Sequence, residues 1–236
     1  MTRRRWIADQ VSGNRAVLLG EHAAHLSRVL RAQVGQEFDI AADGVVRRGR
    51  VVSVSEERVE FELGEEVEAT PLAQVTLALA IFKFDRMEWA IEKCTELGVT
   101  RIVPFAARRT DAHLAAAAVK RVERWRRIAR EAAEQARRAE PPEIVNAVKL
   151  GDVLALRGEL RIVLSEAETV TSLRELCASG GGSSLLLAIG PEGGWTTEEV
   201  QAFAKAGWKA ASLGPTILRA ETAAIAATAV VMAQSA

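Results

Sequence analysis

Apolar and polar residues alternate in short runs up to about residue 70, which is the pattern of strands with one buried face. The turn signals Asp43-Gly44 and Ser55-Glu56-Glu57 lie between some of these runs. The runs are AVLL (16–19), EFDIA (37–41), VVRRGRVVSV (45–54) and RVEFEL (58–63). We therefore predict a small β-rich domain over residues 1–70, with a boundary at Thr70-Pro71.

One segment inside this domain has a different period. In EHAAHLSRVLRAQVGQ, apolar residues recur at roughly helical spacing between positions 24 and 30. That spacing leaves His25, Arg28 and Arg31 on another face, where a basic helix could contact phosphates. The segment is locally basic, although a solvated surface with ordinary charge scatter explains the same pattern.

Beyond residue 70, apolar runs of strand length alternate with segments of helical length. This order predicts an α/β fold, with a parallel sheet covered by helices on both faces, over residues 71–236. The strand-like runs are VTLALAIF, RIVPFAA, RIVLSE, SLLLAIG and AASLG. The helix-like segments are RMEWAIEKCTELG, VKRVERWRRIAREAAEQARR, VTSLRELCA, TEEVQAFAKAG and an Ala-rich C-terminal segment. Trp89, Trp125 and Trp208 are predicted to be core residues.

Three loops follow strand-like runs of this second region. Ligands of open parallel sheets collect at the carboxyl ends of the strands, so these loops are the candidate binding site. The first loop is Leu164-Ser165-Glu166, the second runs from Gly190 to Gly194, and the third runs from Leu213 to Arg219.

The second loop lies in AIGPEGGW, just before a predicted helix. Thr196 and Glu199 form a capping box that sets the start of that helix. The glycines allow a flat ligand to approach the main chain, but the loop matches no phosphate-binding motif, and Glu192 would repel a pyrophosphate. A nucleoside with a positive reactive centre, such as S-adenosylmethionine (SAM), suits the glutamate better. A glycine-rich turn needed only for packing stays an alternative.

The third loop leads into AETAAIAATAVVMA, whose apolar residues surround the predicted helix. Such a helix has to be buried on most sides. Arg219 and Glu221 lie at its start, where charged groups are costly unless they are paired or functional. The pair is therefore either catalytic or a salt bridge that caps the helix.

Composition narrows the possibilities. The 236 residues contain 31 Lys plus Arg and 31 Asp plus Glu, so no net charge draws the protein to nucleic acid or to a membrane. Cys94 and Cys177 lack metal or disulfide spacing, which predicts packing residues in a reducing compartment. His22, His25 and His113 form no metal-binding pattern, so no metal is expected. The chain begins without an apolar signal segment, so a cytoplasmic location is expected.

The motifs taken together resemble one family. IGPEGGW followed by SLGPTILRAETAA is similar to the RsmE family of 16S ribosomal RNA methyltransferases, which belong to the SPOUT class. HLSRVLRAQVGQ, DRMEWAIEKCTELGVTRIVPF and ERWRRIAREAAEQARR also resemble segments of that family, so nearly the whole chain is covered. The chain departs from the family pattern at Trp195, where phenylalanine is usual, and at Ala136, where a small polar residue or glycine is common.

The resemblance implies a trefoil-knotted SPOUT domain, a PUA-like RNA-binding β-barrel at the N-terminus, and a homodimer. The implied reaction is methylation of N-3 of one uridine, at the uridine 1498 position of 16S ribosomal RNA in the small subunit, with SAM as cofactor. The implied cofactor-binding residues are Leu164, Ser165, Glu166, Ile189, Gly190, Pro191, Glu192, Gly194, Leu213, Gly214, Ile217, Leu218 and Arg219.

The reaction requires an imide nitrogen to lose its proton. We predict that Arg219 stabilises the resulting negative charge and that Glu221 orients Arg219 or passes the proton to water. The target base has to leave its stack to reach a pocket. The residues predicted to bind RNA are Arg4, His25, Arg28, Arg31 and Arg48, with Arg108 and Arg109 from the larger domain.

Two alternatives remain. A SPOUT enzyme that methylates a ribose 2′-oxygen would usually carry an Asn-x-x-Arg signature on the first helix of the catalytic domain. DRMEWAIEKCTELG lacks that signature. The second alternative is a non-catalytic RNA-binding or assembly factor, which would show no binding heat with SAM.

Overall fold

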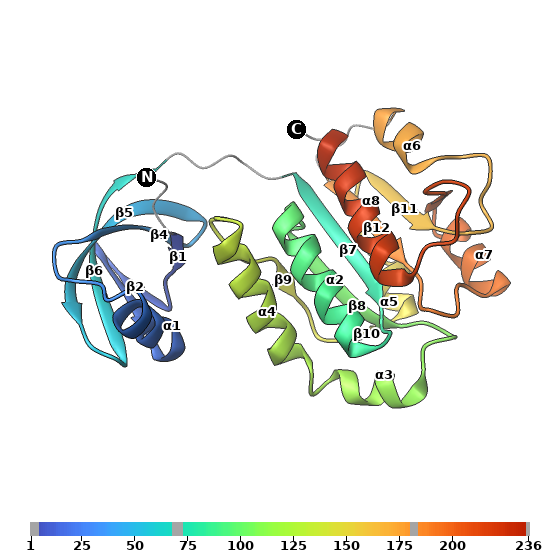
Figure 1. Ribbon diagram of the computed structural model, residues 1–236. Coiled ribbons are helices and arrows are strands. Elements are labelled where there is room, and N and C mark those ends of the chain that lie inside the picture. Colours follow the sequence, from blue (N-terminus) through green and yellow to red (C-terminus); the bar gives the residue numbers. More distant parts are fainter. Residues whose placement is uncertain (1–4, 68–72, 180–183, 235–236) are drawn as a thin grey trace. The chain divides into compact units, whose positions relative to one another are not determined.

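The computed structural model describes residues 5–67, 73–179 and 184–234, which form two compact units (Figure 1). Unit 1 consists of residues 1–71 and 133–141, and unit 2 consists of residues 72–132 and 142–236. Arg4 and the predicted boundary Thr70-Pro71 lie outside the described residues. Each unit has its own sheet and its own core.

Unit 1 is built on a six-stranded sheet. Strand β1 pairs with β4 in parallel, and the other pairs are antiparallel, in the order β1-β4-β5-β6-β3-β2. The predicted runs are strands β3 to β6. The pattern did not indicate β1 and β2, because three residues are too few to show alternation. The strands are β1 (Arg5–Ile7), β2 (Gln10–Ser12), β3 (Arg15–Leu19), β4 (Glu37–Ala42), β5 (Val45–Val54) and β6 (Arg58–Glu66).

The segment with helical spacing forms helix α1 (Gly20–Ala24), which continues as a π-helix (His25–Val29). Leu26 lies in the core of unit 1 together with Leu18, Ile40 and Phe61. The single regular helix expected from the spacing is therefore wrong in detail. A period of 3.6 residues does not reveal a π-turn, in which the hydrogen bonds span five residues.

The sheet of unit 2 is parallel throughout, as predicted. Its strands follow the order β10-β8-β7-β12-β11-β13, and β9 pairs with β8. The crossovers between neighbours contain the helices, as parallel pairing requires. The strands are β7 (Gln74–Ala80), β8 (Arg101–Ala106), β9 (Glu143–Ile144), β10 (Val148–Lys149), β11 (Leu160–Leu164), β12 (Ser184–Ile189) and β13 (Lys209–Ala211).

Helices cover both faces of this sheet, as the alternation along β7 shows. Leu77 and Leu79 pack into a core shared with α2, α4, α6 and α8, whereas Ala78 and Ala80 face a second core with α5 and α7. The two-sided arrangement predicted from the sequence is confirmed. The helices are α2 (Phe84–Leu97), α3 (Ala112–Ala118), α4 (Val122–Gln135), α5 (Leu150–Leu154), α6 (Leu173–Ser179), α7 (Thr197–Lys205) and α8 (Ala220–Gln234).

Helix α8 is surrounded by protein on most sides. Among residues 220–232 only Thr222 is exposed, which matches the apolar residues all round this helix. The helix packs against α2 and α6 (Figure 1). Trp125 and Trp208 are buried as predicted, but Trp89 on α2 is 49% exposed, so its prediction as a core residue is wrong.

Candidate functional site

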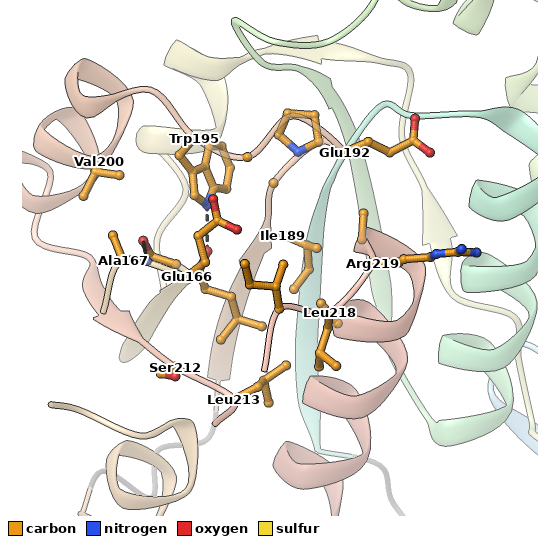
Figure 2. Close-up of a pocket in the computed structure, with 18 of the residues that line it drawn as sticks. Glu166, Ala167, Ile189, Glu192, Trp195, Val200, Ser212, Leu213, Leu218 and Arg219 are labelled. Carbon is orange, nitrogen blue, oxygen red and sulfur yellow. Dashed lines mark hydrogen bonds between the residues drawn. The ribbon is translucent and has the colours of Figure 1, made fainter. Parts of the chain in front are cut away.

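The three predicted loops converge on one pocket (Figure 2). They do so because β12, β11 and β13 are adjacent parallel strands, so that their carboxyl ends lie at one edge of the sheet. The pocket has a volume of about 550 Å³. This volume lies in the range of small-molecule and cofactor sites.

The pocket is lined by all thirteen residues proposed to bind a cofactor. Their role in binding stays a prediction, but their convergence is a property of the fold. The thirteen are Leu164, Ser165, Glu166, Ile189, Gly190, Pro191, Glu192, Gly194, Leu213, Gly214, Ile217, Leu218 and Arg219. The lining residues not anticipated are Arg86, Ala167, Trp195, Thr196, Thr197, Val200, Gln201, Ala211, Ser212, Thr216, Ala220 and Ala223. Most of them are chain neighbours of the predicted residues; Arg86, on α2, is the exception.

The capping box at the exit of the second loop is confirmed. The backbone N–H of Glu199 donates to Thr196 Oγ1 at 3.2 Å, and the N–H of Thr196 donates to Glu199 Oε2 at 2.9 Å. Glu199 is buried, and its Oε1 also accepts from the backbone N–H of Arg108 at 2.7 Å. One carboxylate therefore fixes the start of α7 and the loop after β8.

The loop after β8 also contacts the glycines of the second loop. Arg109 Nη1 donates to the backbone oxygen of Gly193 at 2.7 Å. Arg108 and Arg109, which we predicted to bind RNA, are both exposed beside the second loop. The hydrogen bond uses part of the Arg109 guanidinium, whereas the contact of Arg108 with Glu199 uses its main chain.

Two glycines leave space that a side chain would fill. A Cβ at Gly190 would lie 3.0 Å from the Trp195 ring, and a Cβ at Gly194 would lie 2.9 Å from Glu166 Oε1. Gly194 also has a φ of +69°, a conformation that residues with a side chain rarely adopt. The second loop therefore depends on the absence of side chains at these positions.

Trp195 connects the second loop to the first. Its indole Nε1–H donates to the backbone oxygen of Leu164 at 2.7 Å, and Figure 2 shows the ring above Glu166. The ring stacks on Phe105 with centroids 6.1 Å apart and meets Phe203 edge to face at 5.0 Å. This residue differs from the phenylalanine expected for the family, and a phenylalanine could not donate the hydrogen bond.

Glu192 has a cationic partner in the chain itself. Arg86 Nη1 donates to Glu192 Oε1 at 2.6 Å, and Arg86 Nε lies 3.7 Å from Glu221 Oε1. In Figure 2 the side chains of Glu192 and Arg219 lie on the same side of the pocket, opposite Glu166 and Trp195. The charge of Glu192 is thus compensated by Arg86, so the glutamate alone does not select a cationic ligand.

The two predicted catalytic residues have different environments. Arg219 is exposed, lines the pocket and precedes α8, and its backbone oxygen accepts from Ala223 N–H at 2.8 Å. Glu221 is 3% exposed and pairs with Arg86. The alternative of a salt bridge between Arg219 and Glu221 is therefore corrected, because the cation beside Glu221 comes from α2.

A hydrogen-bonded turn extends the first loop. The Glu168 carboxylate accepts from the backbone N–H groups of Thr171 and Val170, at 3.0 Å and 2.8 Å, and these bonds lower the pKa of Glu168.

The two cysteines do not line the pocket. Burial raises the pKa of the Cys94 thiol to about 12 and also raises the pKa of Cys177, so both are protonated packing residues at neutral pH.

The residues of unit 1 predicted to bind RNA are partly compensated by acids. Arg28 forms an ion pair with Glu56, and Arg48 Nη1 lies 4.0 Å from Glu37 Oε2. His25 is exposed, with its ring centroid 5.7 Å from that of Trp6. Arg31 is exposed and has a φ of +51°. The sequence pattern indicated basic residues but could not show which of them are paired across strands.

The described residues contain no metal cluster and no helix that could span a membrane. Across residues 5–67, 73–179 and 184–234, no three His, Cys, Asp or Glu side chains gather closely enough to hold a metal ion. In the same residues, no helix has both the length and the hydropathy needed to span a bilayer.

A family model and several curated relatives indicate the same family. A family model described as an RNA methyltransferase domain matches residues 68–232. Ribosomal RNA small subunit methyltransferase E of Bacillus subtilis is 34% identical over 218 residues, covering 87% of this chain and 85% of the relative. The enzyme of the same name from Mycobacterium bovis is 35% identical over 227 residues, covering 92% of this chain and 85% of the relative.

Solved structures agree with the sequence comparison. Ribosomal RNA small subunit methyltransferase E from Neisseria gonorrhoeae, bound to SAM, has a TM-score of 0.85 and 29% identity, covering 97% of this chain and 96% of that one. A putative methyltransferase from Legionella pneumophila in complex with SAM also has a TM-score of 0.85, at 28% identity, covering 99% and 98%. Together with the parallel sheet and the three converging loops, these matches place the chain in the ribosomal RNA small subunit methyltransferase E family, as its motifs predicted.

Proposed function

We propose that this protein uses SAM to methylate N-3 of one uridine in 16S ribosomal RNA of the small subunit, at the uridine 1498 position. The observation that carries this proposal is the convergence of three strand-end loops on one pocket, in a chain of this family. Most residues that line the pocket are small or apolar, and Glu166, Glu192 and Arg219 lie at its sides.

The residues present fit SAM. Gly190 and Gly194 keep the second loop open where a Cβ would collide with Trp195 or Glu166. Such a loop lets main-chain amides and carbonyls contact an adenosyl group, which carries donors and acceptors but no phosphate. Residues from all three loops would hold the cofactor, and its chemistry is an electrophilic methyl group on a sulfonium.

The chain itself has to position the nucleophile and stabilise charge. Arg219 is exposed and lines the pocket. We propose that its guanidinium reaches a uracil oxygen, which becomes negative when N-3 loses its proton. Glu221, in the first turn of α8, is proposed to orient Arg219 or to pass the proton to water. Methyl transfer of this kind depends mainly on alignment and on the exclusion of water.

Unit 1 is proposed to bind RNA as a PUA-like barrel. Its exposed Arg31, together with Arg108 and Arg109 of unit 2, provides positive charge for phosphates. The target base is unstacked before it enters the pocket. We propose the same role for Arg4, His25 and the ion-paired Arg28 and Arg48.

We further propose that the C-terminal segment forms the trefoil knot of the SPOUT class and that the enzyme is a cytoplasmic homodimer. What supports the knot is the course of the chain, which leaves edge strand β13 through the third loop and returns to pack α8 against α2. Sedimentation equilibrium would test the dimer, because the expected mass is twice that of the chain.

The function is tested in two steps. Titration calorimetry should show SAM binding, and the absence of heat would favour the non-catalytic alternative. Mass spectrometry of ribosomal RNA from cells lacking the protein should show one uridine without its base methylation, restored by the wild-type gene but not by Arg219→Ala. A missing methyl group on a ribose instead would favour the 2′-oxygen alternative.

A further inference from the structure

Arg86 joins the second pocket loop to the first turn of α8 through two carboxylates. Its Nη1 donates to Glu192 Oε1 at 2.6 Å in the second loop, and its Nε lies 3.7 Å from Glu221 Oε1 in the first turn of α8. The three residues are far apart in the sequence, at positions 86, 192 and 221. A planar guanidinium can serve two carboxylates at once because its donors point in several directions.

Burial makes this arrangement necessary for Glu221. The Glu221 side chain is 4% exposed, and those of Arg86 and Glu192 are 31% and 33% exposed. Within the described residues, Glu221 Oε2 is buried without a hydrogen-bond partner, so Arg86 is the charge that compensates this carboxylate. A buried carboxylate that loses its cation is strongly disfavoured.

Arg86 lies on α2, a helix that is anchored in the core of unit 2. The residues after it on α2, Met87, Ala90 and Ile91, are fully buried in the core of unit 2. The second loop and the start of α8 have exposed residues on the pocket side, including Glu192 and Arg219. The guanidinium therefore connects the second loop and the first turn of α8 to a helix that is anchored in the core.

We propose that Arg86 is a positioning residue for methyl transfer. Through Glu192 it fixes the second loop, which borders the cofactor, and through Glu221 it fixes the first turn of α8 and thereby Arg219. The inference rests on the proposed function, because the first effect concerns SAM and the second concerns the reacting base. Arg86 acts through these two carboxylates and needs no contact with substrate.

The two branches predict different kinetic effects. Glu192→Gln should raise the KM for SAM and leave kcat within about twofold, because only the loop beside the cofactor is released. Glu221→Gln should lower kcat and leave the KM for SAM nearly unchanged, because only the turn that places Arg219 is released. Arg86→Met should do both, with about a tenfold change in each, as expected for the loss of a charged hydrogen bond.

The experiment measures SAM affinity by calorimetry and steady-state methyl transfer to small-subunit RNA for these three variants and for Arg86→Met/Glu192→Gln. The double variant should show no further rise in KM beyond Arg86→Met, because both changes break the same pair. Lys93→Met is the matched control: Lys93 is also on α2 and also contacts two carboxylates, Glu92 and Glu96, but all three lie on one helix outside the pocket.

Three outcomes would overturn the inference. The first is an unchanged KM and kcat in Arg86→Met, and the second is an equal effect of Lys93→Met. The third is additive KM effects in the double variant. If Arg86→Met does not fold, Arg86→Lys replaces it: a single ammonium compensates Glu221 but cannot also bridge to Glu192, so KM should rise severalfold, and wild-type KM would overturn the inference. Failure of the wild-type chain itself to bind SAM would instead contradict the proposed function.

Discussion

The pocket loops of unit 2 and the basic residues of unit 1 are both candidate binding surfaces, but they are built from different chemical groups. In the pocket, neighbouring contacts set the conformation of the main chain around the second loop: the Thr196–Glu199 capping box and the indole of Trp195. The described side chains of unit 1 that we predicted to bind RNA lie on the π-helix, on the segment after it and on β5. There Arg28 pairs with Glu56, whereas Arg31 forms no ion pair within the described residues.

This difference indicates how each surface would bind. A preorganised loop can contact a small ligand without a large loss of conformational entropy, and single-atom changes in it should have large effects. Flexible cations bind a polyanion mainly through counterion release, so the effect of each one is modest and depends on salt. The expected effects of substitutions should therefore decrease from the pocket to unit 1.

Arg219→Ala should have the largest effect on the reaction. We expect kcat for methyl transfer to fall by about 100-fold or more, because one preorganised donor to developing charge contributes on that scale. SAM affinity should stay nearly unchanged, because the other twelve residues predicted to bind the cofactor, which line the same pocket, are left intact. Single-turnover assays with calorimetry measure both quantities. Unchanged turnover would remove Arg219 from the mechanism, and a parallel loss of SAM binding would assign it to the cofactor instead.

Gly194→Ala should have the next largest effect, on binding. An alanine at a φ of +69° costs about 1–2 kcal/mol, and its Cβ would lie 2.9 Å from Glu166 Oε1, so the Kd for SAM should rise about tenfold. Gly151→Ala in helix α5 is the control, because a Cβ there meets nothing within 4 Å. It should leave the Kd unchanged. Equal Kd values for the two variants would mean that the ligand does not depend on the shape of the second loop.

The sequence predicted the pocket well because its signals are local. The capping box at Thr196, the glycines of the second loop and the order of strands and helices are all properties of neighbouring residues, and the parallel sheet then brings the loops together. Arg86 was missed because nothing near it in the sequence indicates the carboxylates of Glu192 and Glu221. Contacts between distant elements follow from tertiary packing, which periodicity does not encode.

In unit 1, contacts between distant elements pair some of the predicted RNA-binding residues with acids, and the sequence pattern did not show these ion pairs. Counting basic residues identified Arg28 and Arg48, but their acidic partners are distant in the sequence: Glu56 lies in the turn between β5 and β6, and Glu37 lies on β4. The π-helix after α1 and the exposed Trp89 were also not predicted, since both depend on how an element packs rather than on its own pattern. Local motifs are thus better guides to main-chain sites than to charged surfaces.

Trp195→Phe should have a moderate effect, because Trp195 connects the second loop of the pocket to the first. The variant loses the hydrogen bond from Nε1 to the backbone oxygen of Leu164, so the free energy of unfolding should fall by about 1 kcal/mol and the Kd for SAM should rise severalfold. Urea denaturation and calorimetry measure the two changes.

Trp208→Phe provides the matched comparison. Trp208 also meets Phe203 edge to face, at 5.2 Å, but its Nε1 is buried without a hydrogen-bond partner in the described residues. Replacing it removes similar ring area and no hydrogen bond, and it should leave the Kd for SAM unchanged. If both variants change the Kd equally, ring packing rather than the contact with Leu164 positions the first loop.

Charge reversal in unit 1 should have the smallest effect and the strongest dependence on salt. Arg31→Glu should weaken RNA binding and reduce the slope of log K against log salt concentration by about one. Arg28→Ala should reduce the slope by less, because Glu56 already compensates that arginine, and Glu56→Gln should strengthen binding by releasing it. Fluorescence anisotropy over a range of salt concentrations measures these slopes. Identical slopes for Arg31→Glu and the wild type would show that this face of unit 1 does not contact phosphate.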